Sequence, residues 1–196
     1  MGSTVLYVTV SVDGYAAAPG DDLSRLHRWL DDAGPQGGDD VARELVERFL
    51  RAGAIIFGRR TWDAGQEPWG DDDVFSSPVF VVTHEARAPE ARNGTLFTYV
   101  SGEPSSILEQ AKAVAGDAEV VIMGSPHTAQ QFLRAGLVDA LLLHVVPVLV
   151  GGGIPLFADL PASRELELLS WRRARDVFAV EYAVLPADEG RALATS

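Results

Sequence analysis

Two segments of the chain combine features that bind phosphate groups in proteins. Residues 54–62 and 120–128 each run from a short apolar stretch through a glycine into residues typical of a helix start. The N-terminus of a helix presents unpaired N–H groups and a partial positive charge, which attract phosphate. Because glycine lets a ligand approach the backbone closely, the turns at Gly58 and Gly124 could hold the two ends of a dinucleotide.

Two arginines follow the first of these glycines. Arg59 and Arg60 are fixed cations whose planar groups suit a 2′-phosphate. Strand–glycine–helix turns also occur in many α/β proteins without a ligand, and the pattern differs from the dinucleotide fingerprint Gly-x-Gly-x-x-Gly. The residues alone therefore leave a phosphate site and a purely structural turn both open.

Metal, thiol and serine chemistry find little support in the sequence. The chain has no Cys. It has four widely separated histidines, His27, His84, His127 and His144. Their spacing fits no ligand set, so we expect no metal site. Ser11 and Ser125 lack the Gly-x-Ser-x-Gly context of serine hydrolases. His144 alternates with apolar neighbours, which predicts a partly buried, hydrogen-bonded strand residue rather than a proton donor.

Charge and hydropathy narrow the classes of partner. The 196 residues carry a formal net charge of −12, which disfavours nucleic acids and anionic membranes. No apolar run reaches the roughly 18–20 residues that span a bilayer. The N-terminus also lacks the basic region of a signal peptide. We therefore expect a cytoplasmic protein that acts on a small molecule.

The order of apolar and amphipathic stretches predicts a three-layer α/β fold. Strands are predicted at residues 4–12, 54–57, 79–83, 96–100, 120–123, 141–150, 166–171 and 177–185. Helical spacing is predicted over 23–30, 41–50, 107–115 and 128–135, with a short turn from Thr61 and loops at 19–24, 31–40 and 64–78. This alternation favours a mostly parallel mixed sheet covered on both faces, closed by a C-terminal antiparallel hairpin.

The sequence also predicts a single domain and leaves two roles open for two of its tryptophans. We expect a single domain over residues 1–186 and a disordered tail over 187–196. Trp29 and Trp69 lie in segments flanked by loops. They could close over a ligand, although packing into the core or a loop is the commoner role of a large aromatic side chain.

Five segments, in order and at suitable spacing, resemble one superfamily. They are residues 11–17, 57–62, 120–124, 129–139 and 146–157. Over about residues 4–185 the chain resembles the dihydrofolate reductase superfamily, in the branch containing the C-terminal reductase domain of bacterial riboflavin biosynthesis (RibD C-terminal-like). The resemblance implies a dihydrofolate-reductase-like fold, NADPH as the cofactor, and pairing into a homodimer. The apolar run at 145–157 is compatible with such pairing.

The resemblance also assigns cofactor contacts residue by residue. Near the phosphates, the pyrophosphate and the nicotinamide it places Gly58, Arg59, Arg60, Thr61, Thr83, His84, Gly124, Ser125, His127, Thr128, Thr9, Ala16 and Ala17. Thr83 and His84 would lie beside the 2′-phosphate, and Thr9, Ala16 and Ala17 beside the carboxamide. The family usually has Gly-Gly where this chain has Gly124-Ser125. The Pro126 that follows removes one N–H, for which His127 could compensate.

No residue is assigned to catalysis with the same clarity. Dihydrofolate reductases place a carboxylate on the helix after the first strand, where Asp40 and Glu44 are the candidates here. Asp39 and Asp40 also suit an N-cap and Glu44 a solvated face, so the match is weak. Leu143 stands where the partner threonine is expected, which disfavours folate reduction. Tyr15 is a further candidate to touch the substrate.

Three functions remain open from the sequence. The first is an NADPH-dependent reductase that transfers hydride to a C=N or C=O bond of a small, pterin- or pyrimidine-like heterocycle. The second is the narrower 5-amino-6-(5-phosphoribosylamino)uracil reductase of the riboflavin pathway. The third is a nucleotide-binding protein without turnover.

Overall fold

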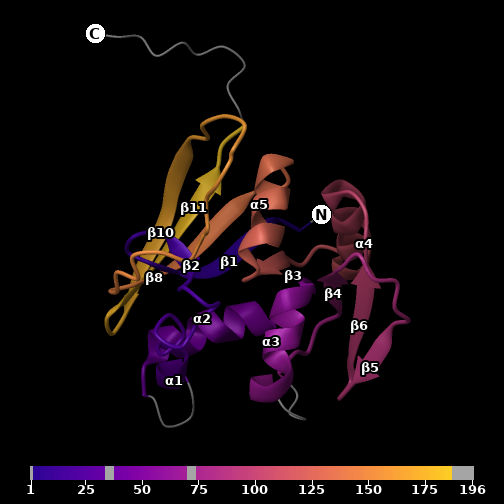
Figure 1. The fold of residues 1–196 in the computed structure, drawn as a ribbon, viewed down its shortest axis with the longest axis horizontal. Helices are drawn as coiled ribbons and strands as arrows, with labels where there is room; N and C mark the ends of the chain where they lie inside the picture. The colour runs from indigo at the N-terminus through magenta and orange to yellow at the C-terminus, as the bar shows by residue number, and fades with distance from the viewer. Residues whose placement is uncertain (1, 34–37, 70–73, 187–196) are drawn as a thin grey trace.

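The computed structural model describes residues 2–33, 38–69 and 74–186, and its centre is one nine-stranded sheet (Figure 1). The strand order is β10-β11-β8-β1-β7-β3-β4-β6-β5. The strands are β1 (Thr4–Ser11), β3 (Ala54–Gly58), β4 (Val79–Val82), β5 (Glu90–Arg92), β6 (Thr95–Val100), β7 (Val120–Met123), β8 (Ala140–Val146), β10 (Leu166–Ala174) and β11 (Val177–Val184). A separate two-stranded sheet pairs β2 (Tyr15–Ala17) with β9 (Ile154–Pro155).

Most neighbouring strands of the large sheet are parallel, as predicted. β1 pairs in parallel with β7 and β8, and β3 pairs in parallel with β4 and β7. β11 pairs antiparallel with both β8 and β10, which confirms the C-terminal hairpin. The strands of the parallel part are apolar on both faces because helices cover both.

Five helices form the outer layers. They are α1 (Leu30–Ala33), α2 (Asp40–Leu50), α3 (Arg59–Trp69), α4 (Pro104–Ala115) and α5 (Pro126–Arg134). Side chains of α4 and α5 share one buried cluster with Leu6 and Ile56, whereas α2 and α3 contribute to clusters on the opposite face. Figure 1 shows α1, α2 and α3 on one side of the sheet and α4 and α5 on the other. The predicted three-layer α/β architecture is confirmed.

Several predicted boundaries are wrong. Residues 64–69 continue α3 where a loop was predicted, and β8 ends at Val146 instead of residue 150. Residues 24–29 form turns, so the helical spacing over 23–30 ends in only the short helix α1. Strands β2, β5 and β9 have two or three residues each and were not predicted. The predicted tail at 187–196 lies outside the described residues.

The predicted start of α2 is confirmed at Asp39. Its carboxylate accepts a hydrogen bond from the Ala42 backbone N–H at 2.8 Å. Further along the same helix, Arg48 forms ion pairs with Glu119, directly before β7, at 2.9 Å and with Glu181 on β11 at 2.7 Å. The hydrogen bond from Arg48 holds the pKa of Glu181 below its usual value. One helix side chain thereby ties together two strands that are not neighbours.

This clamp makes the stability of the protein depend on pH in a defined direction. Because the pKa of Glu181 is lowered in the fold, its contribution is present above the ordinary pKa of about 4.5 and is lost as the pH falls below it. Arg48→Met should lower the free energy of unfolding in urea by about 2 kcal/mol at neutral pH. The difference from the wild type should shrink towards pH ~3.

The control for that measurement is Arg51→Met. Arg51 pairs with Glu47 on the exposed surface of the same helix, where an ion pair contributes little. A loss of stability in Arg48→Met that is equal at neutral and acid pH would contradict the clamp.

Candidate functional site

The two glycine turns lie at a point where the helices following neighbouring strands diverge. β3 and β7 are adjacent and parallel, and each ends in one of the turns. β3 continues into α3 on one face of the sheet, and β7 continues into α5 on the opposite face. Open parallel sheets bind ligands at the carboxyl ends of strands at such a switch point. The fold therefore brings both predicted phosphate turns to adjacent positions at the carboxyl edge of the sheet.

A serine joins these two turns directly. The Gly58 N–H donates a hydrogen bond to the Ser125 Oγ at 2.7 Å, and the Ser125 hydroxyl also forms a short hydrogen bond with the Thr61 hydroxyl. A side chain at position 58 would not fit, because its Cβ would lie 2.6 Å from the Thr128 Oγ1. Gly58 thus permits close packing of the turns, and its N–H, predicted to bind phosphate, is engaged by Ser125.

The residues around this contact are suited to the phosphates of a dinucleotide. Three hydroxyls converge where α3 and α5 begin, from Thr61, Ser125 and Thr128. Since the Ser125 oxygen accepts from Gly58, its own hydrogen remains available to Thr61 or to a ligand. Gly124 and Ser125 both have positive φ, 51° and 43°, which presents the backbone rather than bulky side chains at the turn. NADPH fits this donor set, with one backbone N–H fewer than the sequence predicted.

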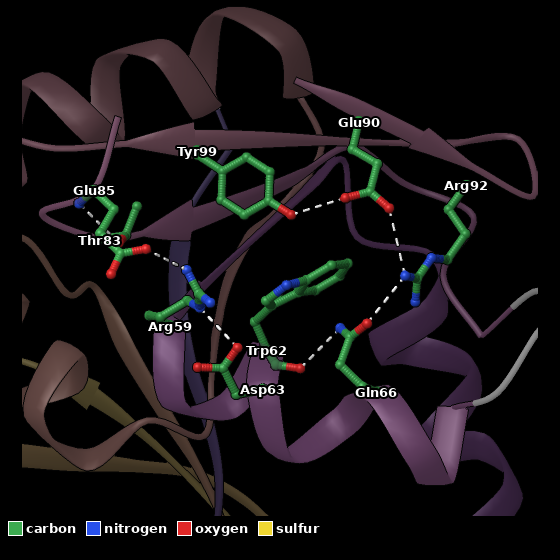
Figure 2. A network of polar contacts seen from close by, with 9 residues as sticks. All are labelled: Arg59, Trp62, Asp63, Gln66, Thr83, Glu85, Glu90, Arg92 and Tyr99. Atoms are coloured by element: carbon green, nitrogen blue, oxygen red, sulfur yellow. Dashed lines mark hydrogen bonds and ion pairs between the residues drawn. The ribbon is translucent and has the colours of Figure 1, made fainter. Parts of the chain in front are cut away.

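The two predicted arginines have different surroundings. Arg59 donates to Asp63 at 2.7 Å and to Glu85 at 2.9 Å, and these contacts, with Asp63 first, raise its pKa. Figure 2 shows the Arg59 guanidinium held between the two carboxylates. Arg60 is exposed and forms no ion pair among the residues that the structure describes. Of these two arginines, Arg60 is consequently the one whose charge no carboxylate among the described residues offsets.

A second set of polar contacts lies beside that of Arg59 and runs from Tyr99 through Glu90 and Arg92 to Gln66 (Figure 2). The buried Thr83 side chain accepts a hydrogen bond from the Glu85 backbone N–H at 3.1 Å, while His84 is exposed. Arg92 lies over the Trp62 ring, with the guanidinium carbon 5.1 Å from the ring centroid. This network fixes the strand ends beside α3, where the sequence placed the 2′-phosphate.

The residues assigned to the nicotinamide lie beside the second turn. The Gly124 N–H donates to the carbonyl of Tyr7 at 3.4 Å, which places the turn next to β1 just before Thr9. Thr9 is nearly buried, and its Oγ1 accepts a hydrogen bond from the Trp29 indole N–H at 3.1 Å. Ala16 and Ala17 are buried on β2, which β9 holds in place.

The candidates for catalysis are not all brought to this position. Asp40 is an exposed partner of Arg43, and Glu44 pairs with Arg172 on β10 at 2.5 Å. Both carboxylates are engaged at the surface of α2. Tyr15 follows the end of β1, where its N–H donates to the Ser11 Oγ at 3.0 Å. Of these three, only Tyr15 adjoins the nicotinamide residues. His127 is exposed at the start of α5. Within the described ranges, no cluster of His, Asp or Glu could hold a metal ion.

The prediction that His144 is partly buried is wrong, because the side chain is fully buried. Neither ring nitrogen forms a hydrogen bond of normal geometry, and the Val8 backbone is near enough to affect the ring. Burial lowers its pKa to about 3, and the nearby Val8 carbonyl only partly opposes this shift. Strand alternation indicated that the ring points inward, but its neighbours Tyr7 and Trp29 follow from the order of strands in the sheet. No local signal in the sequence could have found them.

Comparison with known proteins agrees with this fold. The chain belongs to the RibD C-terminal domain family, whose model matches residues 4–180. It is 22% identical over 179 residues to YwjB of Bacillus subtilis (strain 168), a match covering 91% of this chain and 96% of YwjB. It is 32% identical over 83 residues to the riboflavin biosynthesis protein RibD of Mycobacterium tuberculosis. That match covers 42% of this chain and 23% of the mycobacterial protein.

Solved structures confirm the predicted dihydrofolate-reductase-like fold. A protein from Shewanella sp. PV-4 with an attributed role in riboflavin biosynthesis matches with a TM-score of 0.75 and 26% identity, covering 94% of this chain and 99% of that one. A deaminase/5-amino-6-(5-phosphoribosylamino)uracil reductase from Thermotoga maritima matches with a TM-score of 0.65 and 14% identity. That match covers 94% of this chain and 57% of the Thermotoga protein.

The contact between the two turns can be tested by adding one methyl group. Gly58→Ala would place a Cβ 2.6 Å from the Thr128 Oγ1 and 3.1 Å from the Ser125 Oγ. Overpacking of this kind should lower the free energy of unfolding by about 1–3 kcal/mol, measured by urea denaturation.

Gly152→Ala is the matched control. A Cβ at position 152 would meet only Pro19, at an ordinary contact distance of 3.8 Å, so the change should stay within about 0.5 kcal/mol. Equal stability of both variants would show that the turns do not pack as described.

Proposed function

We propose that this protein is an NADPH-dependent oxidoreductase that reduces a C=N or C=O bond of a small, pterin- or pyrimidine-like heterocycle. The observation that carries the proposal is the pair of glycine turns joined through Ser125 at the switch point between β3 and β7. Membership of the RibD C-terminal domain family supports the reductase class. Membership of this family also favours action in the cytoplasm. No helix among the described residues is long and apolar enough to cross a membrane.

Each group of residues has a distinct task in this proposal. The hydroxyls of Thr61, Ser125 and Thr128 bind the diphosphate, with the start of α5 contributing N–H groups from His127 onward. Arg60 binds the 2′-phosphate beside Thr83 and His84. When NADPH is bound, it supplies the hydride. The buried side chains of Thr9, Ala16 and Ala17 orient the nicotinamide and exclude water from it. The proton comes from water, because no acid is assigned.

Two alternative functions remain open beside this proposal. Reduction of a ribosylamino-pyrimidine phosphate in the riboflavin pathway is supported by the relatives named for that pathway. Nucleotide binding without turnover is supported by two features of the site. Gly58 has lost its free N–H to Ser125, and Arg59 is neutralised by two carboxylates. A substrate panel separates these readings, since only the first requires a phosphorylated pyrimidine.

Cofactor titration tests the proposal directly. Wild-type protein should bind NADPH more tightly than NADH, followed by nicotinamide fluorescence. Arg60→Ala removes a charge-assisted contact and should weaken NADPH binding about tenfold to a hundredfold while leaving NADH binding unchanged. Arg59→Ala should weaken NADPH binding as well, because it leaves the carboxylates of Asp63 and Glu85 uncompensated.

Arg43→Ala serves as the control for this titration. Arg43 pairs with Asp40 on the exposed surface of α2, away from both turns. If neither cofactor binds the wild type, the reductase proposal is withdrawn and the fold assignment stands. If NADPH binds but no carbonyl, imine or pterin compound is reduced, binding without turnover is the better description.

We further propose that the chain forms a homodimer through β10 and β11. Four large apolar side chains lie on one face of this hairpin and are 43–62% exposed, namely Leu166, Leu168, Trp171 and Phe178. The aromatic pair lies at one end of this face and the leucines at the other, so a two-fold axis would place one pair over the other. The run at 145–157, which the sequence favoured, exposes Leu149 and Phe157 instead.

Sedimentation velocity distinguishes the two surfaces. Trp171→Glu places a charge in the hairpin face and should convert a dimer into monomers. Leu149→Glu changes the side chain that is 73% exposed in the other segment, and should leave the dimer intact. Dissociation in Leu149→Glu alone would move the interface to residues 145–157, and a monomeric wild type would exclude the dimer.

A further inference from the structure

A tryptophan side chain packs against the carboxyl halves of the neighbouring strands β1 and β8. Trp29 is 4% exposed, and its indole ring stacks on the His144 ring with a centroid distance of 4.5 Å and an interplanar angle of 21°. The indole N–H donates to the Thr9 Oγ1 at 3.1 Å. Thr9 and His144 are partners in the register of the parallel pair β1 and β8. A flat nitrogen heterocycle of the protein itself thus lies beside the residues assigned to the nicotinamide.

The platform beneath this indole is suited to an uncharged ring. His144 is fully buried and stays neutral at physiological pH because burial lowers its pKa to about 3. Its second neighbour is Tyr7, whose ring centroid lies 4.4 Å away and whose pKa is raised by burial. Among charged groups, Arg48 has the largest effect on the pKa of His144. The charge of Arg48 is balanced by the carboxylates of Glu119 and Glu181. A neutral aromatic platform favours stacking of a neutral ring and disfavours an ion.

His144 also carries an unmet requirement. Both of its ring nitrogens are buried without a hydrogen bond of normal geometry. Native structures rarely leave buried nitrogens so poorly partnered, and the Val8 backbone is near enough to affect the ring without satisfying either nitrogen fully. Replacement of the indole by a smaller ring with polar substituents, or by such a ring and a water, would give these nitrogens partners.

The segment that carries Trp29 has little regular secondary structure to lose when its side chain moves. Residues 24–29 form turns, and α1 has only four residues, so displacement of the indole breaks no long helix. The indole is held at its polar edge by a single hydrogen bond, to Thr9. The neighbouring Leu26 is fully buried and anchors the turns independently of Trp29.

We propose that the Trp29 indole occupies the site of the substrate ring, and that a flat, uncharged nitrogen heterocycle binds there by displacing it. This inference rests on the proposed function, whose substrate class it specifies. The bound ring stacks on His144 and donates an N–H to Thr9, on the face of the sheet that α2 covers. Trp29 then sets the apparent affinity, because only the fraction of molecules with the indole displaced can bind the ring.

Fluorine NMR of the intact chain tests the displacement. The chain has four tryptophans, so labelling with 5-fluorotryptophan gives four resonances, and that of Trp29 is identified with Trp29→Phe. The probe is 5,6-diaminouracil, a flat pyrimidine with N–H donors, added with and without NADPH. The Trp29 resonance should move towards that of free 5-fluorotryptophan in water, while the other resonances stay in place.

A variant without the indole supplies a second measurement. Trp29→Ala removes the competing ring, and calorimetry should show 5,6-diaminouracil binding about tenfold or more tightly than to the wild type, as expected for an open state populated at about 10% or less. Val114→Ala, at an exposed position of α4 on the opposite face of the sheet, is the control and should bind the probe as the wild type does.

The outcomes separate this inference from the proposed function. A Trp29 resonance that does not move at saturating probe, or equal affinity of wild type and Trp29→Ala, overturns the inference and makes Trp29 a core residue. The reductase proposal then still stands if NADPH binds in the same samples. Displacement of Trp29 by the probe without any binding of NADPH would support the ring site and overturn the reductase proposal.

Discussion

The hydrogen bond from the Gly58 N–H to the Ser125 hydroxyl is the contact on which the candidate site depends. It joins the ends of two neighbouring parallel strands at the point where their helices leave on opposite faces of the sheet. The contact requires glycine at position 58, because Thr128 already fills the space that a side chain would take. The contact also occupies the Gly58 N–H, which was predicted to donate to a phosphate. The hydroxyls of Thr61, Ser125 and Thr128 must therefore supply the hydrogen bond that this N–H does not.

Charge in the site is local and does not follow the net charge of the molecule. The chain carries a formal charge of −12, and Arg59 is matched by Asp63 and Glu85. In the proposed function, attraction of a 2′-phosphate therefore rests on Arg60, which stands at the start of α3 with no such partner among the described residues. Fixed carboxylates beside the site also hold the strand ends in place, at the cost of reducing the attraction for anions.

Sequence periodicity predicted the elements well where burial sets the pattern, and poorly where tertiary contacts decide. The apolar strands and α2 with its cap at Asp39 are found as predicted. A loop was predicted from residue 64, but the helix α3 continues to Trp69, and its Trp62 packs against Phe97. Contacts between distant positions, such as Gly58 with Ser125, leave no local signal. The burial of His144 between other rings likewise follows only from the order of strands.

The clamp at Arg48 has a consequence for how the molecule opens. The residue before β7 and the strand β11 are separated in the sheet by β1 and β8, and Arg48 on α2 bridges them from above. A hairpin at the edge of a sheet would ordinarily unfold locally before the centre does. Here, opening of the hairpin also breaks the ion pair between Glu181 and Arg48, and so loosens the helix α2 that covers β1. The backbone amides of β11 should therefore exchange with solvent at rates close to those of β1, so that edge and centre behave as one cooperative unit.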